Sequence, residues 1–300
     1  MIEIFLMSPP GPGWALRGRA NFRSREAPPV DAAKARGEWL RLAEEIEARG
    51  GTVVALPPPA GELTGMPYAA ECGHVVVPAA GGAPRFILPR MASPHRQGEG
   101  AHWQSLARAL GFDVVAPGAG VWEAQGDVAE MDGATLLFFG GRTDRAGMEA
   151  AARHIEGELL RIEVREPAFH GNMAALPLPE VGRMLICPDV VVGDGMARLQ
   201  ERFGDKALVP VSEAEIKSYA TNGLPLGFSL LAPSVVPERV RTLCEELGMR
   251  VVSLDMGELC EKAGGASRCL VSRARVPDEV AARIPAENRL AAVAAGIRGG

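Results

Sequence analysis

The chain has 300 residues, 47% of them hydrophobic, which is enough to bury one extended domain or two ordinary ones. Its 32 basic and 37 acidic residues leave no basic excess to attract a nucleic acid or an anionic membrane surface, so we expect neither as a partner. The apolar start, residues 1–7, is too short and too acidic for a signal peptide, and no run reaches the roughly 20 apolar residues of a membrane helix. We therefore expect a soluble cytoplasmic protein.

Short runs rich in β-branched and aromatic residues recur along the chain and predict strands. In chain order they are residues 52–56, 74–77, 86–88, 113–115, 135–139, 184–187, 207–211, 228–232 and 249–253. Amphipathic stretches between some of them predict helices at residues 32–49, 101–110, 144–156 and 237–247. Because strands and helices alternate, the sequence predicts an α/β fold.

The 36 glycines and 24 prolines punctuate the chain, but no stretch is long enough to link two domains. We therefore predict a single domain over residues 1–300, with a loop-rich N-terminal segment at 8–29 and a C-terminal tail at 277–300. The N-terminal segment is either a simple solvated loop or a lid that closes over a site. The tail is either a packing or oligomerisation helix or a mobile end.

The five cysteines form an odd set without a CxxC pair, which argues against a disulfide framework and against a structural zinc site. Cys269 differs from the others because it closely follows two glycines, Gly264 and Gly265, which let the backbone approach a ligand. The adjacent Arg268 carries a charge that favours a thiolate. Cys269 is therefore the candidate nucleophile, and the alternative is an inert thiol in the core.

A histidine, two carboxylates and an arginine are further candidates. Among five histidines, His170 is best placed, because residues 169–172 form a turn-like piece between apolar segments; the alternative is a structural loop histidine. Glu123 and Asp127 lie shortly before a predicted strand, and they either orient a histidine, hold a cation or form an acidic turn in water. Arg142 follows two glycines and offers a fork for a substrate carboxylate, unless the glycines mark only a turn.

Taken in order, these motifs resemble those of the guanidino-modifying superfamily, which includes dimethylarginine dimethylaminohydrolases, arginine deiminases and glycine amidinotransferases. The resemblance spans roughly residues 5 to 272. It is carried by residues 7–10, 63–66, 71–73, 96–99, 123–127, 141–144, 170, 222–223 and 269. It implies a five-bladed α/β propeller, called pentein-like, in which ββαβ units surround a pseudo-fivefold axis and the active site lies in the central channel.

The resemblance also implies roles for the candidate residues. Cys269 attacks the central guanidine carbon as a thiolate, and His170 protonates the departing amine. Glu123, or in second place Asp127, orients the imidazole. Asp127 binds NH groups of the substrate. Glu71 stands where the family commonly has an asparagine, and we infer from this position that it binds such groups too. Neither a metal nor an organic cofactor is implied.

The other end of the substrate and the charge of the site follow from the same resemblance. Arg142 and Arg96 hold a substrate carboxylate. Asn172 takes the substrate-binding position where the family commonly has an aspartate, and Gly65 replaces another usual aspartate. Because a site with fewer carboxylates holds a cation less strongly, we expect a modified guanidine, an amidine or a ureido compound less cationic than arginine.

The sequence leaves the acceptor open. With water as acceptor the protein is a dimethylargininase-like hydrolase of a C–N bond, which is the interpretation we place first. With an amine as acceptor it is an amidinotransferase. A third alternative is a non-catalytic propeller that binds a macromolecule, and the joint presence of Cys269, His170 and Glu123 argues against it. The expected partner is a small guanidino-type substrate, and a homodimer stays open.

Overall fold

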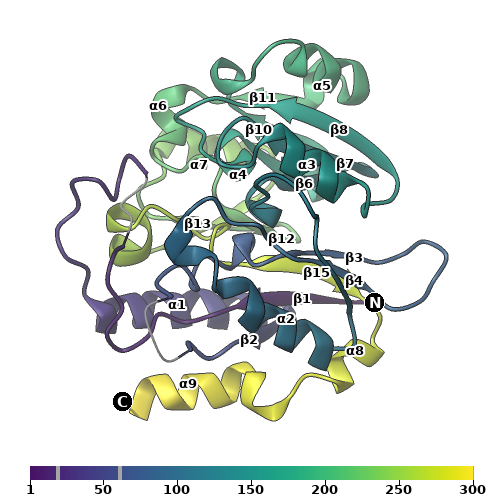
Figure 1. Cartoon of the computed structure of the whole chain (residues 1–300). Coiled ribbons are helices and arrows are strands. Elements are labelled where there is room, and N and C mark those ends of the chain that lie inside the picture. Colours follow the sequence, from purple (N-terminus) through teal and green to yellow (C-terminus); the bar gives the residue numbers. More distant parts are fainter. Residues whose placement is uncertain (18–20, 60–62, 300) are drawn as a thin grey trace.

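The structure, a computed structural model, describes residues 1–17, 21–59 and 63–299. Within these ranges the strands form five three-stranded sheets that repeat one pattern (Figure 1). In each sheet the first strand runs antiparallel to the second, and the third runs parallel to the second after a helical crossover. This is the arrangement of ββαβ units that the sequence resemblance implies.

Four units follow one another along the chain, each with its strands and crossover helix in sequence order. The first of these contains β3 (His74–Val76), β4 (Arg85–Ile87), α2 (Glu99–Ala109) and β5 (Asp113–Val115). The next contains β6 (Val128–Met131), β7 (Ala134–Phe139), α3 (Arg145–Ala152) and β8 (Glu158–Glu163). The last two contain β9 (Ala175–Leu178), β10 (Arg183–Ile186), α5 (Gly195–Phe203) and β11 (Leu208–Pro210), and then β12 (Leu224–Leu226), β13 (Ser229–Pro233), α7 (Glu238–Glu246) and β14 (Arg250–Leu254).

The two ends of the chain meet in the remaining unit. Its first strand is β15 (Ser272–Val276), which pairs antiparallel with β1 (Ile2–Met7). From β1 the chain passes through α1 (Ala32–Glu47) to β2 (Thr52–Ala55), which lies parallel to β1. Because the last strand completes the unit that the first strand began, the five units close around one axis.

The first strands of the five units surround this axis. A common inner cavity is lined by at least one residue of each of them, including His74, Val128, Leu176, Pro225 and Arg273. We call the space along the axis the central channel. One mouth of the channel lies at the amino-terminal ends of these strands and the other at their carboxyl-terminal ends.

Helix α1 illustrates how the crossover helices form. The side chain of Asp31 accepts hydrogen bonds from the backbone N–H groups of Ala33 and Lys34 and so caps the amino-terminal end of the helix. Apolar residues at helical spacing then bury one face, and Trp39 and Ile46 are fully buried in the main core. Apolar residues at helical spacing made α1, α2, α3 and α7 predictable, and side-chain caps are present at α1 and α3.

The tail at residues 277–299 packs against the body of the protein. It contains α8 (Glu279–Ala282) and α9 (Leu290–Gly299), and Leu290 and Val293 of α9 are buried. The buried Asn288 side chain donates a hydrogen bond of 2.9 Å to the carbonyl oxygen of Ala55. Of the alternatives for the tail, the packing helix is the one observed.

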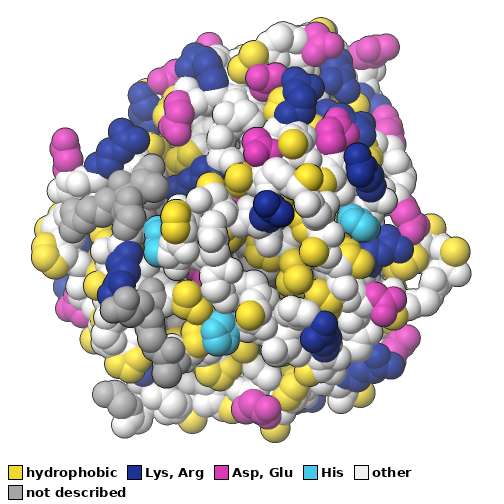
Figure 2. Space-filling view, in the orientation of Figure 1, with side chains coloured by type: hydrophobic (Ala, Val, Ile, Leu, Met, Phe, Trp, Pro, Cys, Tyr) yellow, Lys and Arg dark blue, Asp and Glu magenta, His cyan; other side chains and the backbone are white. Residues whose placement is uncertain are grey.

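Two surface properties follow from the described residues. None of their helices is both long enough and apolar enough to cross a membrane. On the face that Figure 2 shows, acidic and basic side chains are interspersed rather than gathered by sign.

All nine predicted strands coincide with observed ones within one or two residues. The strands that the sequence did not predict are β1, β6, β8, β9, β12 and β15. The helices outside the tail that it did not predict are α4 (Gly171–Ala174), α5 and α6 (Glu213–Ile216). Four of these strands are first strands of units. Pro177 in β9 and Pro225 in β12 argue against a central strand, and the structure accommodates them because a first strand is the edge of its sheet.

Candidate active site

Five polar side chains converge at the amino-terminal mouth of the channel because each comes shortly before the first strand of a different unit. They are Glu71, Glu123, His170, Asn222 and Cys269, which precede β3, β6, β9, β12 and β15. All five are at most 3% exposed. Residues that lie far apart in sequence therefore occupy equivalent positions around the axis, and together they form the candidate active site.

The imidazole of His170 lies between two carboxylates. Its Nε2 is 2.8 Å from Oε2 of Glu123, and its Nδ1 is 3.3 Å from Oε1 of Glu71. Gly126 makes room for the ring, because a Cβ at that position would be 3.1 Å from the nearest ring carbon. A protonated His170 has a carboxylate oxygen beside each of its N–H groups, so the arrangement suits an imidazole that gains and loses a proton.

Glu123 is held as a carboxylate by its surroundings. Burial alone raises its pKa, but the hydrogen bond from His170 and the charges of His170, Arg142 and Arg96 together lower the pKa to about 2. Its second oxygen accepts a hydrogen bond of 3.0 Å from the backbone N–H of Ala92. The charge of Glu123 is thus available at neutral pH to stabilise a protonated imidazole.

Asp127, the second acid of the same segment, contacts the site less directly. It is 3.9 Å from Nε2 of His170 and accepts hydrogen bonds of 2.7 Å from Thr143 Oγ1 and from the backbone N–H of Gly171. Burial raises the pKa of Asp127 to about 6. The distances favour Glu123 as the group that orients the imidazole, while Asp127 fixes the backbone on which His170 lies.

Cys269 is surrounded by side-chain amides. Its Sγ is 3.6 Å from Nδ2 of Asn172. Burial raises the pKa of the Cys269 thiol, whereas hydrogen bonds from Asn222 and Asn172 and the charges of Arg268 and Arg142 act in the opposite direction. The thiol is therefore buried beside groups that stabilise its anion.

Asn222 links the two segments that carry the nucleophile and the base. Its Nδ2 donates a hydrogen bond of 3.1 Å to the carbonyl oxygen of Asn172, and its Oδ1 accepts one of 3.2 Å from the backbone N–H of Ala266. Asn222 was not among the predicted site residues. Residues 222–223 were part of the resemblance. The position of Asn222 before β12, which becomes apparent when the five units are aligned, is the second signal that points to it.

The two candidate arginines occupy different environments. Arg96 is buried, forms an ion pair with Glu71, and donates hydrogen bonds to Glu99 at 2.7 and 2.9 Å and to the carbonyl oxygen of Gly65 at 3.0 Å. A Cβ at position 65 would be 2.0 Å from Nε of Arg96, so the arginine fills the space that a larger residue there would need. The guanidinium of Arg96 is thus neutralised within the protein.

Arg142 is the arginine that stays accessible. Its side chain is 20% exposed, and its Nη1 is 3.7 Å from Oε2 of Glu123. The guanidinium carbon lies 4.8 Å from the centre of the Phe169 ring, a distance at which a cation is attracted to the face of an aromatic ring. Arg142 can therefore receive an anionic group at the mouth.

Carboxylate and imidazole atoms of Glu71, Glu123 and His170 lie within 4.8 Å of one another, which is a spacing that a metal ion also uses. Two guanidiniums already face these carboxylates, Arg96 at Glu71 and Arg142 at Glu123. A metal ion would have to compete with them for the same negative charge.

The described part of the N-terminal segment covers this mouth. A small cavity of about 70 Å³ lies between Trp14 and Asn21 of that segment and Tyr68, Arg96 and Arg142 of the body. Trp14 donates a hydrogen bond of 2.8 Å to the carbonyl oxygen of Thr64, and Asn21 donates one of 3.0 Å to that of Ala263. Of the two alternatives for residues 8–29, the segment therefore resembles a cover; residues 18–20 lie outside the described ranges.

Comparisons with known proteins agree with this architecture. No family model and no curated protein matches the sequence. The N-terminal domain of ArgZ, solved with a covalently bound reaction intermediate, superposes with a TM-score of 0.82 at 21% identity, over 92% of this chain and 98% of that one. ArgZ is described as an arginine dihydrolase of the ornithine-ammonia cycle in cyanobacteria.

Two further solved structures share the fold. Unliganded AgrE has a TM-score of 0.81 at 21% identity, and the match covers 92% of this chain and 40% of AgrE. A dimethylarginine dimethylaminohydrolase with an S-methyl-L-thiocitrulline adduct has a TM-score of 0.66 at 18% identity, over 91% of this chain and 100% of that one. These likenesses show that the chain has the same five-sheet α/β fold as these proteins, and they confirm the predicted fold.

Proposed function

We propose that the protein is a cysteine-dependent hydrolase that cleaves a C–N bond of a guanidino or related amidino compound through a covalent thiouronium-type intermediate. The observation that carries this proposal is the buried convergence of Cys269, His170 and Glu123, in which His170 and Glu123 are hydrogen-bonded at 2.8 Å. The covalent intermediate on ArgZ and the adduct on the dimethylarginine dimethylaminohydrolase support it, since both belong to proteins of the same fold.

The first half-reaction uses the nucleophile and the base together. The Cys269 thiolate attacks the central carbon, a C–S bond forms, and the C–N bond breaks as His170 donates a proton to the departing amine. Glu123 and Glu71 stabilise the imidazolium before this transfer, because each lies beside one of its nitrogens. The intermediate is a thiouronium or its neutral analogue.

The second half-reaction restores the enzyme. Water attacks the same carbon while His170 accepts one of its protons, the C–S bond breaks, and the thiolate leaves. The amides of Asn172 and Asn222 then contact the regenerated thiolate. Because both steps use His170, protons gained in one half-reaction are returned in the other.

The contacts also divide the remaining candidates by role. We assign Asn172 and Arg142 to the substrate, since Asn172 contacts Sγ and Arg142 is partly exposed at the mouth. Arg96 and Asp127 already have partners, so we assign them to positioning the site rather than to a substrate carboxylate or NH group. Glu71 faces His170 and serves the imidazole first.

Mass spectrometry of the intact protein after exposure to a panel of guanidines, amidines and ureas tests the proposal. We expect an adduct that corresponds to one substrate without its leaving amine, and its absence in Cys269→Ser, where turnover falls on the order of 10³-fold or more. Cys187→Ser is the matched control, because Cys187 is a buried thiol in the main core. An adduct that persists in Cys269→Ser would contradict the proposal.

Release of ammonia or alkylamine identifies the acceptor. A hydrolase releases the amine and a urea-type product in water alone. If turnover appears only after an acceptor amine is added, the protein is an amidinotransferase. If neither adduct nor turnover appears with any compound, while a cellular activity survives Cys269→Ser, the propeller acts without catalysis.

A further inference from the structure

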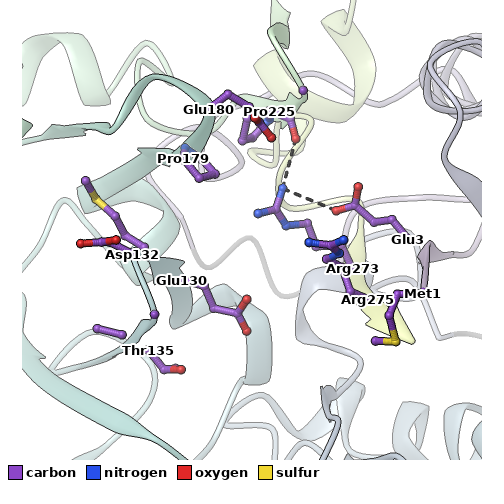
Figure 3. A pocket seen from close by; sticks show the side chains of 14 residues that line it. Met1, Glu3, Glu130, Asp132, Thr135, Pro179, Glu180, Pro225, Arg273 and Arg275 are labelled. Carbon is purple, nitrogen blue, oxygen red and sulfur yellow. Dashed lines mark hydrogen bonds and ion pairs between the residues drawn. The ribbon is translucent and has the colours of Figure 1, made fainter. Parts of the chain in front are cut away.

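The second mouth of the central channel, at the carboxyl-terminal ends of the first strands, opens into a cavity of about 680 Å³. A narrower inner cavity of about 100 Å³ continues from it toward the active site. The two cavities share Glu3, Glu130, Pro225, Arg273 and Arg275 in their linings. Figure 3 shows Arg273 and Arg275 projecting into the outer cavity from β15, and Glu130 projecting into it from the opposite wall.

The inner cavity carries more positive than negative side chains. Arg268, Arg273 and Arg275 line it, against the carboxylates of Glu3 and Glu130. Burial lowers the pKa of the neighbouring His74 to about 4, and Arg268 acts in the same direction while Glu130 opposes it, so this imidazole is neutral near pH 7. Three guanidiniums therefore face two carboxylates.

Arg268 is the least compensated of the three. Its guanidinium donates hydrogen bonds only to neutral oxygens, at 2.8 Å to the carbonyl of Val271 and at 3.1 Å to Oε1 of Gln125, and no carboxylate of a described residue lies within 4.0 Å. Burial, and then the charge of Arg273, lowers its pKa to about 10. Arg268 is half-buried. A cation drawn partly out of water is more stable beside a counter-charge, so the lack of one among the described residues points to one from solution.

Gln125 fixes the two inner arginines in place. Its Oε1 accepts from Arg268 and, at 2.9 Å, from the backbone N–H of Arg273, while its Nε2 donates at 2.7 Å to the carbonyl oxygen of Arg273. The same Nε2 lies 3.2 Å from Nδ1 of His74. Gln125 and His74 are each 3% exposed, so a buried polar pair holds Arg268 and the backbone of Arg273, while the guanidinium of Arg273 stays partly exposed.

Arg273 has only a weak partner of its own. Its Nη1 lies 4.0 Å from Oε1 of Glu3 and donates a hydrogen bond of 3.1 Å to the carbonyl oxygen of Pro225 (Figure 3). No ion pair joins Arg275 to any described residue at or below 4.0 Å. Guanidinium groups bind oxyanions through paired N–H donors, and a volume of 100 Å³ corresponds to about three water molecules, comparable to one small oxyanion.

We propose that the inner cavity is a binding site for one small oxyanion, a phosphate or a carboxylate group, held between Arg268 and Arg273. The outer cavity is its entry path. This site lies inside the channel and is entered from the mouth opposite to that of Cys269 and His170, and it does not depend on the chemistry proposed for them.

An occupied site also acts on the nucleophile. Arg268 is the chain neighbour of Cys269, and its charge lowers the pKa of that thiol. An anion bound to Arg268 cancels part of this charge, so less of Cys269 is present as thiolate at a given pH. We therefore expect the oxyanion to slow reactions of Cys269 without entering the active site.

Equilibrium dialysis of the full chain with labelled inorganic phosphate, and separately with labelled acetate, tests binding. We expect one equivalent of at least one of the two anions to bind, and Arg273→Gln to weaken its affinity roughly tenfold or more. Arg41→Gln is the control, since Arg41 is a 65% exposed arginine on α1. The comparison of phosphate with acetate identifies the preferred oxyanion.

Arg142→Gln locates the bound anion. If Arg142→Gln removes binding and Arg273→Gln does not, the anion occupies the active site and the proposal is wrong. Absence of saturable binding of either anion to the unaltered protein also overturns it. Should Arg273→Gln fail to fold, Arg268→Gln removes the other guanidinium of the proposed site and supplies the same comparison of binding.

The coupling is measured by the rate of Cys269 alkylation with iodoacetamide at one pH. The anion that binds is compared with chloride at equal ionic strength, which removes general screening. We expect that anion to slow alkylation several-fold in the unaltered protein and in Arg41→Gln, and to leave Arg273→Gln unaffected. The assay needs no substrate, so it gives a result even if the proposed hydrolysis is wrong.

Discussion

The charged side chains at the two ends of the central channel differ in whether the protein supplies their counter-charges. At the amino-terminal mouth Glu71 faces Arg96, and Glu123 faces both His170 and Arg142. In the inner cavity that opens at the other mouth, Arg268 has only neutral oxygens beside it. The comparison indicates that charges paired within the protein hold the candidate catalytic groups in place, whereas a half-buried guanidinium without a counter-charge among the described residues marks a place for a ligand.

Replacing one carboxylate at each mouth is expected to show the largest difference between the two mouths. Glu123→Gln keeps the size of the side chain but removes the charge that stabilises a protonated His170, so we expect kcat to fall on the order of 10²- to 10⁴-fold. Glu130→Gln removes a carboxylate from the second mouth and should leave kcat within a few-fold. Steady-state kinetics on the compound identified by adduct formation measures both. Equal losses in the two variants would contradict the separate roles of the mouths.

The pH dependence of the free energy of unfolding compares a buried carboxyl group at the amino-terminal mouth, Asp127, with an exposed one at the second mouth. Its pKa rises from an ordinary 3.8 to about 6 on folding, so the folded state binds this proton more tightly than the unfolded state. The stability it contributes is complete below about pH 3.8 and is lost as the pH rises through about 6. In Asp127→Asn the free energy of unfolding should therefore fall less over this range, by up to about 3 kcal/mol.

Denaturant unfolding at several pH values measures this slope. Asp132→Asn is the matched control, because Asp132 lies at the second mouth with a side chain that is 78% exposed. We expect the control to follow the unaltered protein across the range. A slope that is the same in all three proteins would show that Asp127 does not titrate as its burial indicates.

A side chain added at Gly65, near the amino-terminal mouth, is expected to have a smaller effect on stability. In Gly65→Ala the new Cβ would displace the side chain of Arg96, which lies 2.0 Å from its position, and Glu71 would lose its counter-charge. We expect a destabilisation of about 1 to 3 kcal/mol in thermal or denaturant unfolding. Gly98→Ala is the control, since its nearest neighbour is an ordinary contact with Leu63 at 3.4 Å. A neutral Gly65→Ala would show that Arg96 is free to move.

The sequence predicted the outer parts of each unit better than the strands along the channel. The strands β7 and β13 are runs of apolar residues, which indicate burial. By contrast β12 is Leu-Pro-Leu, a short run interrupted by proline, and β15 is Ser-Arg-Ala-Arg-Val, whose two arginines line the polar channel. These two first strands therefore lack the run of β-branched and aromatic residues by which a strand is usually predicted.

The candidate site was also only partly predictable from the sequence. Cys269, His170 and Glu123 were found because their order along the chain resembles that of a known superfamily, and the structure brings them to one mouth. The pairing of the charged groups could not be predicted. Glu71 and Arg96 lie on either side of β3 and β4 and meet only when their unit folds. The contact between Gln125 and Arg268 spans 143 positions of the chain and depends on the closure of the ring.

The smallest effect is expected from loosening the N-terminal segment that covers the amino-terminal mouth. This change tests whether the two mouths differ in access. Trp14→Phe removes the hydrogen bond from Nε1 to the carbonyl oxygen of Thr64 while keeping most of the aromatic contact. Such a bond contributes about 1 kcal/mol, so the cover should open more often and alkylation of Cys269 should accelerate up to about fivefold. The exchange of phosphate at the second mouth should not change.

Trp39→Phe separates this effect from general loosening of the fold. Trp39 is fully buried on α1, and its Nε1 has no hydrogen-bond partner, so the substitution removes volume from the core but no bond of the cover. We expect Trp39→Phe to lower the unfolding temperature while Cys269 alkylation stays at the rate of the unaltered protein. If both variants accelerate alkylation equally, access to Cys269 is governed by fluctuations of the whole domain. The N-terminal segment is then not the barrier that makes the amino-terminal mouth less accessible than the second mouth.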